Sequence, residues 1–298
     1  MCDVLVALGR ATARGVTLFA KNSDRPPSER QVVEYVGPRL DIGSTTTTYV
    51  EVAAHHDPTL PCVISRPSWG WGAEHGVNVH GVAVGNTTVY TTLDPRGAGP
   101  GLTGMDLVRL ALERATTADG AVGIITALLA EHGQGGSGHD PAAGRERPYW
   151  NSFLVADPTS AYVIDTSGRD HAVERVEAVR AISNRTTIPS FDAAHRHPRQ
   201  PVERLVDPRW EASRAVLAQW PVTREQLVDH LRSHDSCGEA GWSVCMHVEG
   251  VEETTSSMIA ELAPDGASVL WLLTGHPCTH EYTRVLFADA ATSDLSLG

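Results

Sequence analysis

Residues 1–27 read MCDVLVALGRATARGVTLFAKNSDRPP. Residues 4–8 form an apolar run of strand length, residues 9–15 are a polar segment bounded by glycines, and residues 16–20 form a second strand pattern. This order predicts a β-hairpin. The second strand leads into the polar string Lys21-Asn22-Ser23-Asp24-Arg25, which Pro26 and Pro27 end. The hairpin therefore presents polar side chains at one edge of a sheet.

Cys2 follows the initiator methionine directly. Methionine aminopeptidases remove Met1 when the next side chain is small, and removal would leave one residue with a thiol and a free α-amine. The unperturbed pKa is ~8.5 for a thiol and ~7.7–8.0 for an α-amine, so the amine can accept the thiol's proton near neutral pH. Because the thiolate is the nucleophile, Cys2 is a candidate catalytic residue. The alternative is a small second residue without a function.

Lys21 and Asp24 are expected to approach Cys2. In an antiparallel hairpin the end of the second strand lies beside the start of the first. A cation near the sulfur favours the thiolate, and a carboxylate can hold the α-amine in place. The alternative is that residues 21–24 form only a solvated loop.

Motifs along nearly the whole chain resemble one family. After the opening residues and Lys21-Asn22-Ser23-Asp24-Arg25-Pro26, the resemblance continues through these segments: SRPSWGWGAE (65–74), GVAVGN (81–86), GMDLVRLALER (104–114), HGQGG (132–136), NSFLVAD (151–157), AISN (181–184), SVCMH (243–247) and TGHPC (274–278). This order is similar to that of the secernin and C69-type dipeptidase family of N-terminal-nucleophile hydrolases, which is distantly similar to penicillin V acylases and bile-salt hydrolases. The chain departs from the pattern where Thr87 follows Asn86, since many relatives carry a Glu there.

The resemblance implies a four-layer αββα sandwich, α+β in class, with two antiparallel sheets between helix layers and Cys2 at the start of a central strand. It also implies that Asn86 and Asn184 stabilise an oxyanion or hold the attacked amide. Arg214 falls near a site arginine of the acylases and is a candidate for substrate binding. The alternatives are strand-end asparagines that serve turns and a solvated arginine on a helix.

Trp69 and Trp71, which flank Gly70, are candidates for the wall of a substrate pocket, together with the charged Glu74. Plain core packing is the alternative. A metal site is not expected: His247, His276, Cys278 and His280, with Cys245 nearby, are of zinc-ligand types, but their spacing matches no zinc motif. No cofactor motif is found either.

Composition limits the remaining choices. The chain has 298 residues, 41% of them hydrophobic, and a net charge of −12, which argues against nucleic acid or anionic membranes as partners. No run of ~18 apolar residues predicts a membrane span. The five cysteines are irregularly spaced, which argues against a disulfide framework and favours the cytoplasm. Self-association into a homo-oligomer stays open.

Strand and helix patterns come in runs and pairs rather than in strict alternation, which indicates α+β. No linker divides the chain, so a single domain over residues 1–298 is expected. The expected strands are 62–65, 82–86, 152–156, 161–165, 179–183, 243–247, 256–262 and 269–274, and the expected helices are 103–117, 119–131, 208–219 and 223–233.

These features together predict a cysteine N-terminal-nucleophile hydrolase that cleaves an amide bond through a Cys2 thioester, with a dipeptidase as the first choice. An amidohydrolase of N-acyl amides, or an acyltransferase in which an amine replaces water, would keep the chemistry and change the substrate. A secernin-like binding or regulatory protein without turnover is the alternative from a different class.

Overall fold

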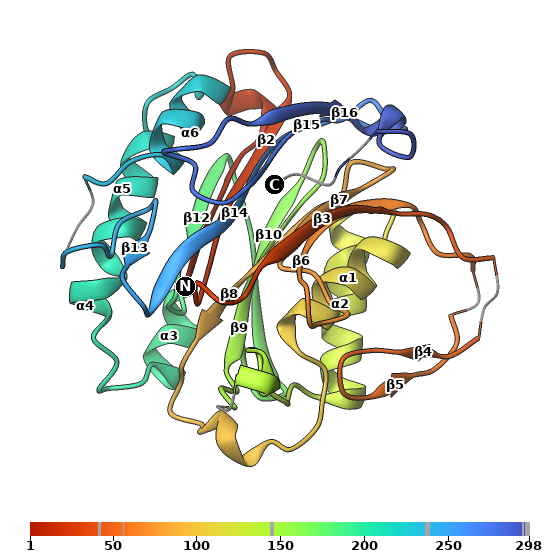
Figure 1. Cartoon of the computed structure of the whole chain (residues 1–298), viewed down its shortest axis with the longest axis vertical. Helices are drawn as coiled ribbons and strands as arrows, with labels where there is room; N and C mark the ends of the chain where they lie inside the picture. Colours follow the sequence, from red (N-terminus) through yellow and green to blue (C-terminus); the bar gives the residue numbers. More distant parts are fainter. Residues whose placement is uncertain (41–42, 56, 144–145, 236–238, 294, 296–298) are drawn as a thin grey trace.

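The computed structural model describes residues 1–40, 43–55, 57–143, 146–235, 239–293 and 295. Two antiparallel sheets of seven strands each dominate it (Figure 1). The first sheet has the order β12 (Val179–Ile182), β1 (Cys2–Ala7), β2 (Thr17–Arg25), β14 (Glu252–Leu262), β15 (Val269–Thr274) and β16 (Thr283–Leu286), with β13 (His247–Val248) paired to β14. The second has the order β11 (Asp170–Arg175), β10 (Ala161–Ser167), β9 (Trp150–Ala156), β8 (Ala83–Val89), β7 (His75–Asn78), β6 (Cys62–Pro67) and β3 (Gln31–Val36). β4 (Thr45–Thr46) and β5 (Glu51–Val52) form a separate pair.

Helices cover the outer face of each sheet (Figure 1). α1 (Gly104–Arg114) and α2 (Ala118–His132) pack on the second sheet, whereas α5 (Asp207–Leu217) and α6 (Arg224–Leu231) pack on the first. The short helices α3 (Pro189–His195) and α4 (Val202–Leu205) precede α5. The expected α+β sandwich of four layers is thereby confirmed.

β1 shows how the sequence produces the layers. All six of its residues are buried. Val4 and Val6 face the core between the two sheets, while Leu5 and Ala7 face the layer of α5 and α6. Because side chains alternate along a strand and both faces of this strand are covered, a continuous apolar run is required here. Its neighbours β12 and β2 make β1 a central strand, as expected.

Threonine hydroxyls cap the N-termini of α1, α2 and α6. The Thr103 side chain accepts from the backbone N–H of Asp106, whose carboxylate bonds back to Thr103, which is a capping box. Thr117 and Thr223 cap α2 and α6. These threonines fix the starts of three of the four expected helices within two residues of the expected positions.

Two expectations about strands were wrong. β2 does not end at residue 20 but runs through Arg25, because β14 pairs with its other edge along that whole length. Residues 243–246 are not a strand: the N–H of Cys245 bonds to the carbonyl of Ser233, and the N–H of Met246 bonds to the Thr254 hydroxyl. In the part of the chain that the structure describes, no helix is long and apolar enough to cross a membrane.

Candidate active site

Cys2 lies at the first position of β1, buried between the two neighbouring strands, and is paired in register with Ser23 of β2. Its Sγ is 4.0 Å from the Ser23 hydroxyl. Its backbone nitrogen donates a hydrogen bond of 2.9 Å to Oδ1 of Asn184, which follows β12. The nitrogen of the candidate nucleophile is therefore held by a side chain from the adjacent segment.

Arg209 completes the environment of this nitrogen, although the sequence pattern did not single it out. The guanidinium is fully buried and donates from Nη2 to Asn184 Oδ1 at 2.9 Å and from Nη1 to Asp3 Oδ2 at 2.6 Å. A buried charge requires such pairing. Arg209 lies on α5, so this helix contributes an arginine to the start of β1.

Asp24 lies beside Met1 and Arg209. Its backbone N–H bonds to the carbonyl of Met1, and its Oδ1 accepts from the Thr254 hydroxyl at 2.7 Å. Its Oδ2 is buried without a hydrogen-bond partner and is 3.9 Å from Arg209 Nη1. Burial raises the pKa of this carboxyl to about 7, although the nearby N-terminal ammonium and Arg209 favour the charged form.

Lys21 is buried beside Val4 in the register of β1 and β2. Its Nζ donates to the carbonyl of Glu74 at 2.7 Å, to Glu74 Oε2 at 3.3 Å and to Asn86 Oδ1 at 3.3 Å. Glu74 also pairs with Arg25. Burial opposes the charged form of Glu74, but Lys21 and Arg25 outweigh it and lower the pKa of Glu74 to about 2.

Asn86 bridges Lys21 to a second polar side chain. Its Nδ2 donates to Asn151 Oδ1 at 2.9 Å, and Asn151 in turn donates to Gln134 at 2.9 Å. Asn86 lies within β8 of the second sheet, so it connects the cation of one sheet to the amide network of the other. Its first effect in this arrangement is to position Lys21.

The thiol of Cys2 is not pre-ionised in the chain that retains Met1. Burial raises its pKa, and the opposing influence of Lys21 and of the N-terminal ammonium is the smaller one. A neighbouring cation alone therefore does not produce the thiolate that the sequence led us to expect. A base must remove the proton during attack.

The ammonium of Met1 has two hydrogen-bond acceptors. It donates to Glu252 Oε1 at 2.6 Å and to the carbonyl of Asp24 at 3.1 Å. Burial disfavours the ammonium, but the nearby acidic groups, Glu252 first, outweigh it, so the pKa of the ammonium is raised. Glu252 is the first residue of β14 and is distant from Met1 in sequence, so no local pattern pointed to it.

Met1 also lines a cavity of about 670 Å³. Its walls combine apolar side chains with charged ones, and they come from the segments after β8, before β9 and around α4. Its lining residues include Tyr90, Arg147, Arg199, Leu205 and Trp242. Met1 lies in the wall of this cavity, whereas its neighbour Cys2 is not among the lining residues.

None of the four expected substrate-binding residues, Trp69, Trp71, Glu74 and Arg214, lines this cavity. The indole N–H of Trp69 donates to Glu29 at 2.9 Å. Trp71 packs against the guanidinium of Arg109, 4.3 Å from the ring centroid, beside the core under α1. Both tryptophans thus have polar or packing partners within the protein.

Arg214 is exposed on α5, with its guanidinium carbon 4.9 Å from the ring centroid of Trp210. The buried arginine of this helix is Arg209, because its position faces the first sheet whereas Arg214 faces solvent. Glu74 does reach the site, but as the partner of Lys21 rather than as a cavity wall.

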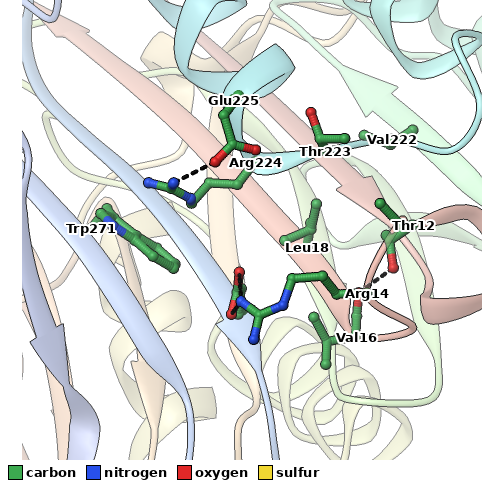
Figure 2. Close-up of a pocket in the computed structure, with 11 residues that line it drawn as sticks. Thr12, Arg14, Val16, Leu18, Val222, Thr223, Arg224, Glu225 and Trp271 are labelled. Atoms are coloured by element: carbon green, nitrogen blue, oxygen red, sulfur yellow. Dashed lines mark hydrogen bonds and ion pairs between the residues drawn. The ribbon is translucent and has the colours of Figure 1, made fainter.

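A second, smaller pocket of about 170 Å³ lies at the opposite end of β2, around the hairpin turn (Figure 2). Arg14 and Glu261 form an ion pair of 2.8 Å there, and Arg224 stacks 4.6 Å from the ring centroid of Trp271. None of the residues that line it is a cysteine. It lies at the hairpin turn, away from Cys2 at the start of β1, and is therefore not the candidate site.

Comparison with known proteins gives a fold and not a family. No family model matches the chain. A mutant of conjugated bile acid hydrolase from Clostridium perfringens superposes with a TM-score of 0.57 at 10% sequence identity, covering 99% of this chain and 94% of that chain. Another variant of that hydrolase gives a TM-score of 0.57 at 11% identity, covering 98% and 94%. An N-acylethanolamine-hydrolyzing acid amidase ortholog from Caenorhabditis elegans gives 0.48 at 11% identity, covering 87% and 92%. The chain thus has the same fold as the bile acid hydrolase over nearly its whole length.

Proposed function

We propose that the chain is a cysteine amide hydrolase of the N-terminal-nucleophile type, active once the bond between Met1 and Cys2 is cleaved. The observation that carries the proposal is the hydrogen bond from the Cys2 nitrogen to Asn184 Oδ1, next to Asp24 and Arg209. After cleavage this same nitrogen becomes the α-amine, already held close to its own thiol. Base and nucleophile then belong to one positioned residue.

In the proposed reaction the α-amine accepts the proton of Sγ as the sulfur attacks the amide carbonyl carbon. The C–S bond forms and the carbonyl oxygen becomes an oxyanion. As the C–N bond breaks, the leaving amine takes the proton from the α-ammonium, which leaves a thioester on Cys2. Water, deprotonated by the α-amine, then attacks the thioester and releases the acid and the free thiol.

The surrounding side chains have separate tasks in this proposal. Asn184 orients the amine, and the Lys21 cation lowers the cost of negative charge on the sulfur and the oxyanion. A primary amide has two N–H donors, and Asn86 and Asn184 each direct one to a protein oxygen. The second donor of each is assigned to the oxyanion or to the substrate amide.

For the substrate we propose a small peptide with a free amine, a dipeptide above all. Glu252 holds the ammonium of Met1, one Cα away from the carbonyl bonded to Cys2, and a dipeptide would place its own ammonium in a comparable position. Arg147 and Arg199 in the cavity wall suit the terminal carboxylate. The apolar side chains of Tyr90, Leu205 and Trp242 favour an N-acyl amide as the second candidate.

The test compares two cysteine variants on a panel of dipeptides and N-acyl amino acids with mass detection. Cys2→Ala should abolish hydrolysis with an unchanged circular dichroism spectrum, while Cys62→Ala, in the core under α1, should keep the active-site chemistry. A Cys2→Ala rate above about a tenth of wild type would exclude Cys2 as the nucleophile. No turnover and no adduct of a thiol-reactive substrate analogue on processed wild type would favour the binding-protein alternative.

A further inference from the structure

Four potential metal ligands from three separate segments meet at the rim of the first sheet. They are His234 after α6, Cys245 before β13, His247 in β13, and Cys278 between β15 and β16. Their ligand atoms all lie within 4.8 Å of one another. His247 Nε2 is 3.4 Å from Cys245 Sγ and 3.3 Å from Cys278 Sγ.

These separations are close to those of a tetrahedral zinc site. With Zn–S bonds of ~2.3 Å and Zn–N bonds of ~2.0–2.1 Å, ligand atoms around one zinc ion are about 3.3–3.8 Å apart. The two His247–Cys distances already fall in this range. The imidazole of His234 lies against that of His247, with ring centroids 5.1 Å apart, so it needs only a small adjustment to join them.

We propose that His234, Cys245, His247 and Cys278 bind one zinc ion. Thiolates and imidazoles select zinc over magnesium, calcium or manganese, which prefer oxygen ligands. The two thiolates balance the charge of the ion. Since all four coordination positions come from the protein, no position remains for water or substrate, and the ion has a structural role.

The backbone around the ligands shows what the ion would hold together. The N–H of Cys245 bonds to the carbonyl of Ser233, next to His234, at 3.0 Å. The N–H of Met246 bonds to the Thr254 hydroxyl at 2.9 Å, and that hydroxyl donates to Asp24. The metal would therefore fasten the segment after α6 to the β15–β16 connection, directly behind the carboxylate beside Cys2.

The sequence could not indicate this site. Zinc motifs are recognised when two ligands are close in sequence and the second pair has a similar spacing. Here only Cys245 and His247 are near neighbours, as Cys-x-His, and the strands β14 and β15 separate them from Cys278. The convergence is a product of sheet pairing, and the zinc proposal departs from the expectation of no metal site that the spacing alone supports.

The test measures zinc in protein purified under reducing conditions and saturated with zinc sulfate, by mass spectrometry of the metal after gel filtration. We expect one zinc per chain. Cys245→Ser, Cys278→Ser and His234→Gln should lower this content or weaken zinc affinity at least tenfold. Matched controls that should keep one equivalent are Cys62→Ser, Cys2→Ala and His276→Gln, whose ring lies 4.5 Å from that of His247 without joining the four ligands.

A second measurement does not depend on the folding of variants. In wild type, zinc should protect Cys245 and Cys278 from alkylation, and a chelator should expose both, as read by peptide mapping. Cobalt(II) in place of zinc should give the visible absorption of a tetrahedral thiolate site. Wild type that binds no zinc, a Cys245–Cys278 disulfide in the native protein, or full zinc content in a Cys245→Ser/Cys278→Ser double variant would overturn the proposal. Because Cys2→Ala keeps the ion, these results are independent of the proposed hydrolysis.

Discussion

Asp24 carries a buried carboxylate oxygen without a hydrogen-bond partner, one residue from the strand position that faces Cys2. Such an atom is costly to bury, and the cost is visible in a pKa raised to about 7. In the chain that retains Met1, the N-terminal ammonium and Arg209 are the charges that favour ionised Asp24. Cleavage after Met1 would move that ammonium to the nitrogen of Cys2.

Because of the Asp24 carboxylate, we expect the free energy of unfolding of the chain that retains Met1 to depend on pH. Its folded pKa of about 7 lies above the reference value of 3.8, so the folded state binds more protons between these values. The contribution of Asp24 to the free energy of unfolding is therefore complete below about pH 4 and falls as the pH rises through 7. Asp24→Asn should remove this decline in urea unfolding curves recorded from pH 4 to 8. A decline of unchanged size in the variant would show that Asp24 is not its source.

The Glu252→Gln variant tests whether Glu252 binds the free ammonium group of the substrate. If Glu252 binds the substrate ammonium, losing its charge should raise KM for free dipeptides about tenfold or more while kcat changes little. N-acylated analogues of the same dipeptides lack the ammonium and should show no increase. The matched control is Glu253→Gln, the next residue on β14, which is partly exposed. Equal KM changes for both substrate types would remove Glu252 from the binding site.

In each sheet a buried asparagine donates a hydrogen bond to a carbonyl at the C-terminal end of a helix that covers the sheet. Asn22 of β2 donates to the carbonyl of Leu231, the last residue of α6, and to that of Val244 in the segment before β13. Asn78 of β7 donates to the carbonyls of Leu112 and Ala115, at the end of α1. Carbonyls in the last turn of a helix have no partner within the helix, so these side chains satisfy them and join a helix to the sheet below it.

Replacing either asparagine by alanine should lower the free energy of unfolding by about 2 kcal/mol or more, since buried carbonyls lose their donors. Urea denaturation measures this for Asn22→Ala and Asn78→Ala. Only Asn22→Ala should also lower turnover, because its partner Val244 leads into Met246 and Thr254 beside Asp24. Equal effects on turnover would mean that global destabilisation, and not this connection, is responsible.

The elements that local chemistry determines were predictable from the sequence. Thr103, Thr117 and Thr223 signal helix starts, and the β1–β2 hairpin follows from apolar runs around a polar turn. The strand predicted at 243–247 was wrong for residues 243–246, because the apolar side chains of Val244 and Met246 are buried by an irregular segment and not by a strand. Arg209 and Glu252 were missed because their contacts with residues 1–3 depend on how distant strands and helices pack, which periodicity does not encode.

At the scale of the whole molecule, the two sheets bring residues from the entire chain to Cys2. Lys21 and Asp24 come from one sheet and Asn86 from the other, while Asn184 and Arg209 come from the segment between β12 and the end of α5. The thiol cannot ionise on its own because burial raises its pKa, and no histidine hydrogen-bonds to it among the described residues. In the proposed reaction the α-amine of a processed Cys2 therefore takes the role of the base.

Activity should consequently depend on the loss of Met1. A preparation that retains Met1, made while the host methionine aminopeptidase is inhibited, should turn over at least about 10² times more slowly than one treated with aminopeptidase, since general acid–base catalysis contributes ~10²–10⁴. Intact mass gives the processed fraction of each sample, and dipeptide hydrolysis gives its rate. Equal rates would point to a side-chain base instead.

The ion pair between Met1 and Glu252 gives the unprocessed chain a tethered ligand of its own. A group on a short tether is present at an effective concentration in the millimolar range, whatever the concentration of the protein. A free dipeptide must exceed that level to displace it. Cleavage of the Met1–Cys2 bond releases this occupant as dilute free methionine. The fraction of chains with a reactive Cys2 thiol should therefore equal the fraction of chains whose cavity binds added ligand.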